Sequence, residues 1–275
     1  MRWCARCRDP ELRRRSGQRE PLALPDWLVE ALATEGAPGL HGFDPVRQCA
    51  PSCPAFRGVR VYPNAVTEAE AERLLGHIEA RPFAPSQSGK QKQHFGPRFN
   101  FLRRRMNAER FAGLPEHAGW LEARLRALVA EDRAGDPVDL ADARRALDTY
   151  RTTDVFVLRY DEEERSNLDF HVDDLFAYGE AILDLSLGSD SVLSFLGPFE
   201  PAAPASPSAC VRVPLPARSL AVVYGAARFD WQHAILPQDV RGVRTSITLR
   251  TLAPALRETE AGRVVLARAT GAPID

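Results

Sequence analysis

The sequence predicts an α+β protein, with helices in its first half and a sandwich or jelly roll of short strands in its second half. From Thr152 onward, short apolar or alternating runs are bounded by Gly, Pro and Asp, as strands usually are. Between about 114 and 133, in contrast, apolar residues recur at helical spacing. The expected strands are 154–160, 181–187, 192–196, 210–213, 219–224 and 244–252.

The first half predicts an extension over residues 1–54, then one strand and two helices. The strand is expected within 56–66. Thr67 and Glu70 are spaced as a capping box, which predicts a helix from Glu68 to about Ala80, ended by the prolines that follow. The second helix, over about 114–133, has one apolar stripe made of Leu121, Leu125, Leu128 and Val129.

Five residues of the second half point to a metal site with an anion clamp: His171, Asp173, His233, Arg244 and Arg250. Two imidazoles and one carboxylate are the ligand set that holds non-haem Fe(II) and leaves positions open. Strand alternation would place His171 and Asp173 on one face, and Arg244 and Arg250 on the polar face of their strand. A guanidinium suits the carboxylate of an oxo acid bound at such a metal.

Cysteine and charge patterns bound the other possibilities. Cys4 and Cys7 form one close pair and Cys49 and Cys53 another, so the extension either holds a structural zinc ion or carries free thiols. The net charge is −1, so nucleic acid would have to meet a local basic patch. We expect no secretory leader and no membrane span, and therefore a reducing compartment, cytoplasmic and/or nuclear.

Residues 86–107 form a basic strip with interleaved aromatic residues. It holds six positive charges and no acid, with Gly96-Pro97 as a turn. Such a strip suits phosphate contacts and base stacking, an acidic protein surface, or simply a solvated hairpin face.

Four segments resemble the AlkB family of Fe(II)/2-oxoglutarate-dependent dioxygenases, and most of all the AlkB homolog four type. They are 155–160 (VFVLRY), 169–174 (DFHVDD), 231–235 (WQHAI) and 244–250 (RTSITLR). Further resemblance lies at 86–89, 95–101, 214–219 and 225–228, and the likeness covers about residues 55–255.

The resemblance implies roles for individual residues. His171, Asp173 and His233 match the iron ligands. The 2-oxoglutarate contacts would be Arg244, Arg250, Tyr160 and Ser246. Many members carry an asparagine shortly before the tyrosine, where this chain has Val157 and Leu158. The residues that match the substrate-recognition lid are Lys90, Lys92, His94, Phe95, Arg98, Phe99 and Phe101.

The resemblance also implies an organisation and a function. The chain would divide into a Cys/Arg-rich extension (1–54), helical support and lid (55–150), a double-stranded β-helix (jelly-roll) core (151–257) and a tail (258–275). The activity would be oxidative N-demethylation by a monomer, releasing formaldehyde, succinate and CO2. The substrate would be methylated lysine in an actin-like protein and/or N6-methyladenine in DNA.

Three alternatives use the same residues. The first is a catalytically weak AlkB-fold binding module that acts through its basic lid and Cys-rich head. The second is a structural interaction protein whose activity lies in the Cys-rich head and the basic strip. The third, a zinc hydrolase on the same ligands, leaves the paired arginines without a role.

Overall fold

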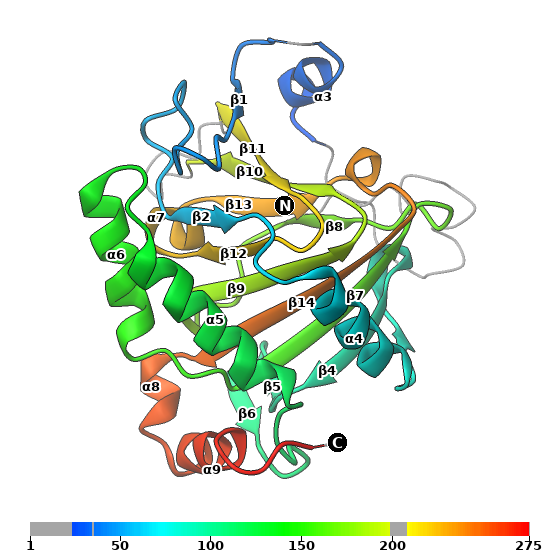
Figure 1. The fold of residues 1–275 in the computed structure, drawn as a ribbon, viewed down its shortest axis with the longest axis vertical. Coiled ribbons are helices and arrows are strands. Elements are labelled where there is room, and N and C mark those ends of the chain that lie inside the picture. Colours follow the sequence, from blue (N-terminus) through cyan, green and yellow to red (C-terminus); the bar gives the residue numbers. More distant parts are fainter. Residues whose placement is uncertain (1–23, 35, 199–207, 275) are drawn as a thin grey trace.

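The chain folds around two facing β-sheets, with helices packed outside the larger one (Figure 1). The computed structural model describes residues 24–34, 36–198 and 208–274. Apolar side chains fill the space between the sheets and also the space between the large sheet and the helices. The α+β prediction is confirmed, and the strands of both sheets pair antiparallel except β1 and β11, which are parallel.

The large sheet has seven strands in the order β2-β12-β9-β14-β7-β4-β3. Its ladders are antiparallel, and β14 is central because it pairs with β9 on one side and β7 on the other. The strands are β2 (Val59–Tyr62), β3 (Ala84–Pro85), β4 (Gln91–Phe95), β7 (Asp154–Asp161), β9 (Tyr178–Gly188), β12 (Leu220–Val223) and β14 (Val243–Leu252).

The small sheet has five strands in the order β1-β11-β10-β13-β8. They are β1 (Leu40–Gly42), β8 (Leu168–His171), β10 (Ser191–Gly197), β11 (Ala209–Leu215) and β13 (Gln232–Ile235). A separate hairpin joins β5 (Arg98–Asn100) to β6 (Arg105–Asn107).

Three helices cover the outer face of the large sheet: α4 (Glu68–Glu79), α5 (His117–Glu131) and α6 (Pro137–Asp148) (Figure 1). The predicted capping box is present, because Thr67 accepts from the Glu70 amide and Glu70 accepts from the Thr67 amide. The shorter helices are α3 (Asp26–Leu32), α7 (Gly225–Phe229), α8 (Pro254–Arg257) and α9 (Glu260–Ala269), and two 3₁₀ turns cover Gln87–Gly89 and Pro237–Asp239. No helix among these described residues is long and apolar enough to cross a membrane.

The structure corrects several boundaries. The helix predicted over about 114–133 is α5, which ends at Glu131, and a further helix follows it: Asp136 caps α6 and Pro137 occupies its first turn. The segment beyond 258 contains α9. The predicted division at residue 151 does not follow the sheets, because β2, β3 and β4 belong to the large sheet. Likewise, β1 comes from the predicted extension.

Candidate metal and cosubstrate site

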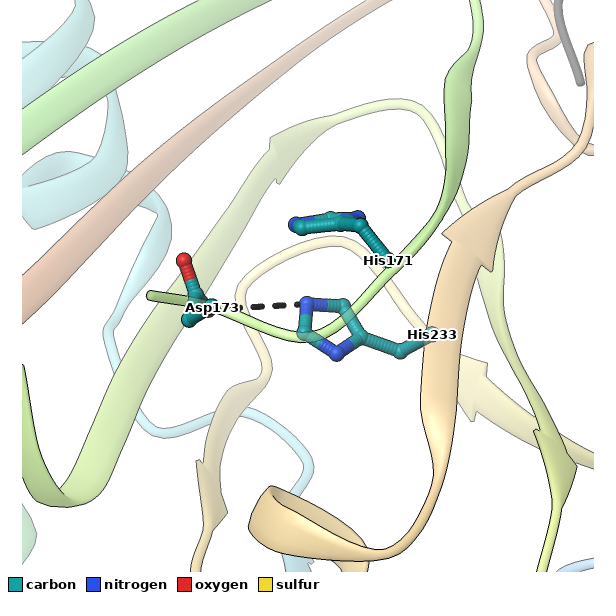
Figure 2. A group of neighbouring side chains, drawn as sticks. All are labelled: His171, Asp173 and His233. Carbon is teal, nitrogen blue, oxygen red and sulfur yellow. Dashed lines mark ion pairs between the residues drawn. The ribbon is translucent and has the colours of Figure 1, made fainter. Parts of the chain in front are cut away.

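The three candidate metal ligands meet at the edge of the small sheet (Figure 2). His171 ends β8 and lies directly across the ladder from His233 on β13. Asp173 lies two residues beyond the end of β8, so the strand is shorter than alternation from His171 to Asp173 would require. One ligand atom from each residue lies within 4.8 Å of the other two.

Hydrogen bonds and burial prepare these groups for a cation. His171 Nδ1 lies 2.8 Å from the carbonyl oxygen of Asp169, which leaves Nε2 for a metal. Asp173 Oδ2 is buried and has no hydrogen-bond partner among the described residues; it lies 3.6 Å from His233 Nε2. A buried carboxylate oxygen without a partner is costly, and a bound cation would remove that cost.

Electrostatics favour the protonation states that a metal needs. Burial, and then the neighbouring His171, lower the pKa of His233 to about 3, so its imidazole is neutral. Burial raises the pKa of Asp173, but the charge of Arg250 outweighs burial and holds it well below its usual range. A neutral imidazole at His233 and an ionised carboxylate at Asp173 are the forms that bind Fe(II).

Arg244, the first arginine of β14, has hydrogen-bond partners at two of its three guanidinium nitrogens. Arg244 donates from Nε to Ser186 Oγ at 3.0 Å and from Nη2 to Asp184 Oδ2 at 3.1 Å. Its Nη1 is buried without a partner among the described residues. The guanidinium lies 5.1 Å from the ring centroid of Tyr160, its ladder partner on β7. An anion that meets Nη1 would complete this arrangement.

The second arginine links Asp173 to strand β7 of the large sheet. Arg250 contacts Asp173 Oδ1 through Nη2 at 3.1 Å and Asp154 Oδ1 through Nη1 at 3.3 Å. Asp154 Oδ2 lies 2.5 Å from His94 Nε2 on β4. Arg250 therefore fixes one oxygen of Asp173 and leaves Oδ2 for the metal.

A cavity of about 140 Å³ joins these groups between the two sheets. Ser246 and Thr248 lie between the two arginines on the polar face of β14 and also line the cavity. Tyr160 faces the same space. Burial raises the pKa of Tyr160 to about 12, so its phenol stays protonated and can donate to an anion. Leu158 also lines the cavity and offers an apolar contact there.

Two carboxylates at the site are absent from the sequence-based assignments. Asp184 lines the cavity from β9, and Asp154 supports Arg250 from β7. The signal for Asp184 was a charged residue inside the apolar run 181–187. Asp174, in contrast, accepts from the amides of Phe176 and Ala177 and so caps a turn.

The predicted lid residues separate into two groups. Lys92, His94 and Phe95 lie on β4, which pairs with β7 in the large sheet, and Lys90 is only 5% exposed. Lys90 is therefore not part of an exposed basic strip. The second group belongs to the β5–β6 hairpin and comprises Arg98, Phe99 and Phe101.

The β5–β6 hairpin is connected to Arg250 through aromatic contacts. The Phe99 ring stacks on Phe101 at 5.8 Å and meets the edge of Tyr178 at 5.5 Å between centroids. Tyr178 lies 4.9 Å from the Arg250 guanidinium. Leu102, at the hairpin tip, is fully exposed.

The structure gives no support to the predicted zinc site. Cys4 and Cys7 lie outside the described residues. Cys49 and Cys53 are free thiols, and burial raises the pKa of Cys53, which favours the neutral thiol over a metal-binding thiolate. Within the described ranges, the metal-ligand group is the one formed by His171, Asp173 and His233.

Comparison with known proteins agrees with this site. Residues 58–266 match the 2OG-Fe(II) oxygenase superfamily. The chain is 30% identical over 238 residues to the human alpha-ketoglutarate-dependent dioxygenase alkB homolog 4, covering 77% of this chain and 74% of the human protein. It is 27% identical over 201 residues to a Caenorhabditis elegans DNA N6-methyl adenine demethylase, covering 73% of this chain and 62% of the nematode protein.

The solved structure of OsALKBH1 aligns with a TM-score of 0.49 at 13% identity, covering 71% of this chain and 99% of that one. The sequence matches decide the classification: the chain belongs to the 2OG-Fe(II) oxygenase superfamily and, within it, to the AlkB family. That superfamily uses Fe(II) and 2-oxoglutarate, which are the metal and the oxo acid that the residues of the cavity fit.

Proposed function

We propose that the protein is an Fe(II)/2-oxoglutarate-dependent dioxygenase that removes methyl groups from nitrogen by oxidation. The observation that carries this proposal is the shared cavity, in which the ligand set of the small sheet faces the arginines of the large sheet. Iron with 2-oxoglutarate supplies the activation of O2 and the hydroxylation of an N-methyl group, which then leaves as formaldehyde.

The chain's own residues bind and orient. His171, Asp173 and His233 would hold the metal. Arg244 would hold the distal carboxylate of the oxo acid from the opposite sheet, and the Tyr160 phenol would donate beside it. Arg250 keeps Asp173 ionised and oriented. These groups are fixed before any ligand arrives, which is how a protein site assists such chemistry.

For the substrate we propose an N-methyl group on a protein lysine and/or on N6-methyladenine in DNA. The name of one relative, a DNA N6-methyl adenine demethylase, supports the methyladenine part of this proposal, and another relative is named as a dioxygenase of the alkB homolog 4 type. The lysine part follows from the resemblance to that type. Action as a monomer, in the cytoplasm or the nucleus, stays a prediction.

Succinate formation tests the activity without knowledge of the substrate. Purified protein receives Fe(II), ascorbate, O2 and 2-oxoglutarate, and His171→Ala is the matched control. We expect succinate from the wild type and none from the variant. If the iron-loaded wild type forms no succinate even with methyl-lysine peptide and methyladenine DNA present, the binding-module alternative replaces this proposal.

The exposed hairpin separates the two substrate classes. Arg103, Arg104 and Arg105 are exposed there, and contacts to phosphates make binding fall steeply with salt through counterion release. We would compare formaldehyde release from methyladenine DNA and from methyl-lysine peptide between low and high salt. Replacing the three arginines by glutamine would abolish turnover of DNA while leaving succinate formation without substrate unchanged. Equal loss of both activities would contradict a role for the hairpin in substrate binding.

A further inference from the structure

The cosubstrate end of the cavity already contains a carboxylate. Asp184 points from β9 into the cavity, where Oδ2 accepts from Arg244 at 3.1 Å and Oδ1 accepts from Thr248 at 2.8 Å. Its side chain is 17% exposed. The group that would hold the distal carboxylate of 2-oxoglutarate is therefore already neutralised.

The arginine has one donor group left for the cosubstrate. Its Nε is bound to Ser186, its Nη2 to Asp184, and its Nη1 has no partner among the described residues. A carboxylate at Nη1, or at both terminal nitrogens, would lie beside the Asp184 carboxylate on the same planar guanidinium. Two ionised carboxylates in one buried site repel each other, and the usual result is that one takes up a proton.

The other charged groups that face Asp184 are already engaged. On β14, Arg250 is paired with Asp154 and Asp173. On β7, Tyr160 is neutral, with Lys90 5.8 Å from its ring centroid and donating to the carbonyl of Asn167. His171 and His233 face the cavity from the small sheet, and β12 contributes Val223.

We propose that Asp184 is an exchangeable counter-ion of Arg244, which takes up one proton from solvent when the distal carboxylate of 2-oxoglutarate binds. The inference rests on the proposed function, because it assumes that Arg244 holds this carboxylate. The protonated Asp184 would then donate to the incoming carboxylate instead of repelling it. In agreement, burial raises the pKa of Asp184, against the opposing effects of Arg244 and Thr248.

The sign of the pH dependence follows from this exchange. Below the pKa of Asp184 in the free protein, the residue is already protonated and the Kd for 2-oxoglutarate is independent of pH. Between that pKa and the higher pKa of Asp184 in the complex, each binding event takes up a proton, so the Kd rises about tenfold for each pH unit. An ordinary arginine clamp with a permanently charged neighbour would show a flat Kd over the same range.

Calorimetry on the Mn(II)-loaded protein, without O2, measures the proton directly. Titrations of 2-oxoglutarate in phosphate and in Tris, whose ionisation enthalpies differ, give the number of protons taken up at each pH in the range around 7 to 8 where both buffer. We expect net proton uptake that follows the rise in Kd with pH. The control ligand is 2-oxobutyrate, which has the same metal-binding end but no distal carboxylate, and it should take up none.

The matched variants are Asp184→Asn and, on the surface, Asp142→Asn. We expect Asp184→Asn to bind 2-oxoglutarate more tightly than the wild type, by about tenfold for each pH unit above the pKa of Asp184 in the free protein, with a flat Kd and no proton uptake, and Asp142→Asn to resemble the wild type. If Asp184→Asn does not fold, Thr248→Val removes a hydrogen bond to the ionised form. That variant should move the rise in Kd to higher pH.

Two negative outcomes are distinguishable. If the wild type binds 2-oxoglutarate without proton uptake at any pH, or Asp184→Asn binds it more weakly, Asp184 is a permanent positioning partner of Arg244 and the inference is wrong. If the Mn(II)-loaded wild type does not bind 2-oxoglutarate at all, the proposed function fails and the inference fails with it.

Discussion

The two arginines of β14 share one strand face but have different partners. Arg244 is oriented by Ser186 and Asp184 and offers Nη1 to the cavity, whereas Arg250 joins two buried carboxylates. Alternation along the strand predicts that both side chains face one way. Their division of roles depends on β7 and β9, which flank β14 in the sheet.

Replacing Arg244 by Lys should weaken the binding of 2-oxoglutarate. One ammonium group cannot hold Ser186, Asp184 and an incoming carboxylate at the same time, because it lacks the planar fork. Losing one hydrogen bond between charged groups predicts a rise of about ten- to a hundredfold in the apparent KM for 2-oxoglutarate. Arg159→Lys, outside the cavity on β7, is the control. An unchanged KM in Arg244→Lys would remove this residue from the clamp.

Asp154→Asn should weaken the binding of the metal, although Asp154 is not a candidate ligand. Without the charge of Asp154, Arg250 would pair more completely with Asp173 and draw the carboxylate away from the metal. Changes to groups that support metal ligands typically cost about 10- to 100-fold in affinity. Competition of Mn(II) with a chelating dye measures this loss, and Asp142→Asn is the surface control. Equal affinities in the two variants would show that Asp154 does not influence the site.

Sequence alone could predict the candidate ligands and the arginines but not what supports them. The choice of His171, Asp173 and His233 as candidates follows from ligand chemistry, since few residue types bind Fe(II), and the structure brings them together. Asp154 and Asp184 acquire their roles only when neighbouring strands bring them beside β14. Such pairing joins residues far apart in the chain, which no local pattern reports.

Helix ends and strand ends were predictable to different degrees. The capping box fixed the start of α4 because its hydrogen bonds join residues close in sequence. In β8, by contrast, the strand stops at His171 and Asp173 belongs to the turn that follows. Where a strand stops depends on its ladder partner, so alternation predicted the grouping of the two residues but not the local backbone.

Thr67→Ala should destabilise α4 and the sheet face beneath it. The variant removes the hydroxyl that accepts from the Glu70 amide, and losing such a cap costs about 1 kcal/mol of the free energy of unfolding. The midpoint temperature of thermal unfolding should fall by roughly 2–4 °C for a protein of this size. Thr67→Ser keeps the hydroxyl and should unfold near the wild type. A Thr67→Ala midpoint equal to that of Thr67→Ser would exclude the cap as a source of stability.

At the scale of the whole molecule, one buried arginine ties the sheet to its helices. Arg60 on β2 is fully buried and bonds Asp132, which follows α5, and Asp139 in α6. Tyr62 and Tyr224 donate to the same two carboxylates. A buried charge needs this degree of hydrogen bonding to be tolerated.

Arg60→Ala should therefore be among the most damaging changes outside the site. It would leave buried Asp139 without its cation, which typically costs about 3–5 kcal/mol. Arg57→Ala removes an exposed pair with Asp136 and should cost less than about 1 kcal/mol. Urea denaturation compares the two variants. Similar midpoints would mean that the Arg60 network contributes no more than a surface pair.

The two sheets contribute different halves of the site. The metal ligands come from the small sheet and the turn after β8, whereas Arg244, Tyr160 and Asp184 come from the large one. An oxo acid that is chelated to the metal and bound by Arg244 would connect the two sheets. Loading the protein should then raise its melting temperature in two separable increments. Metal alone would stabilise the folded protein through its ligands beside the small sheet. Metal with 2-oxoglutarate would stabilise it further through contacts with both sheets, so the shift in melting temperature measures occupancy independently of turnover.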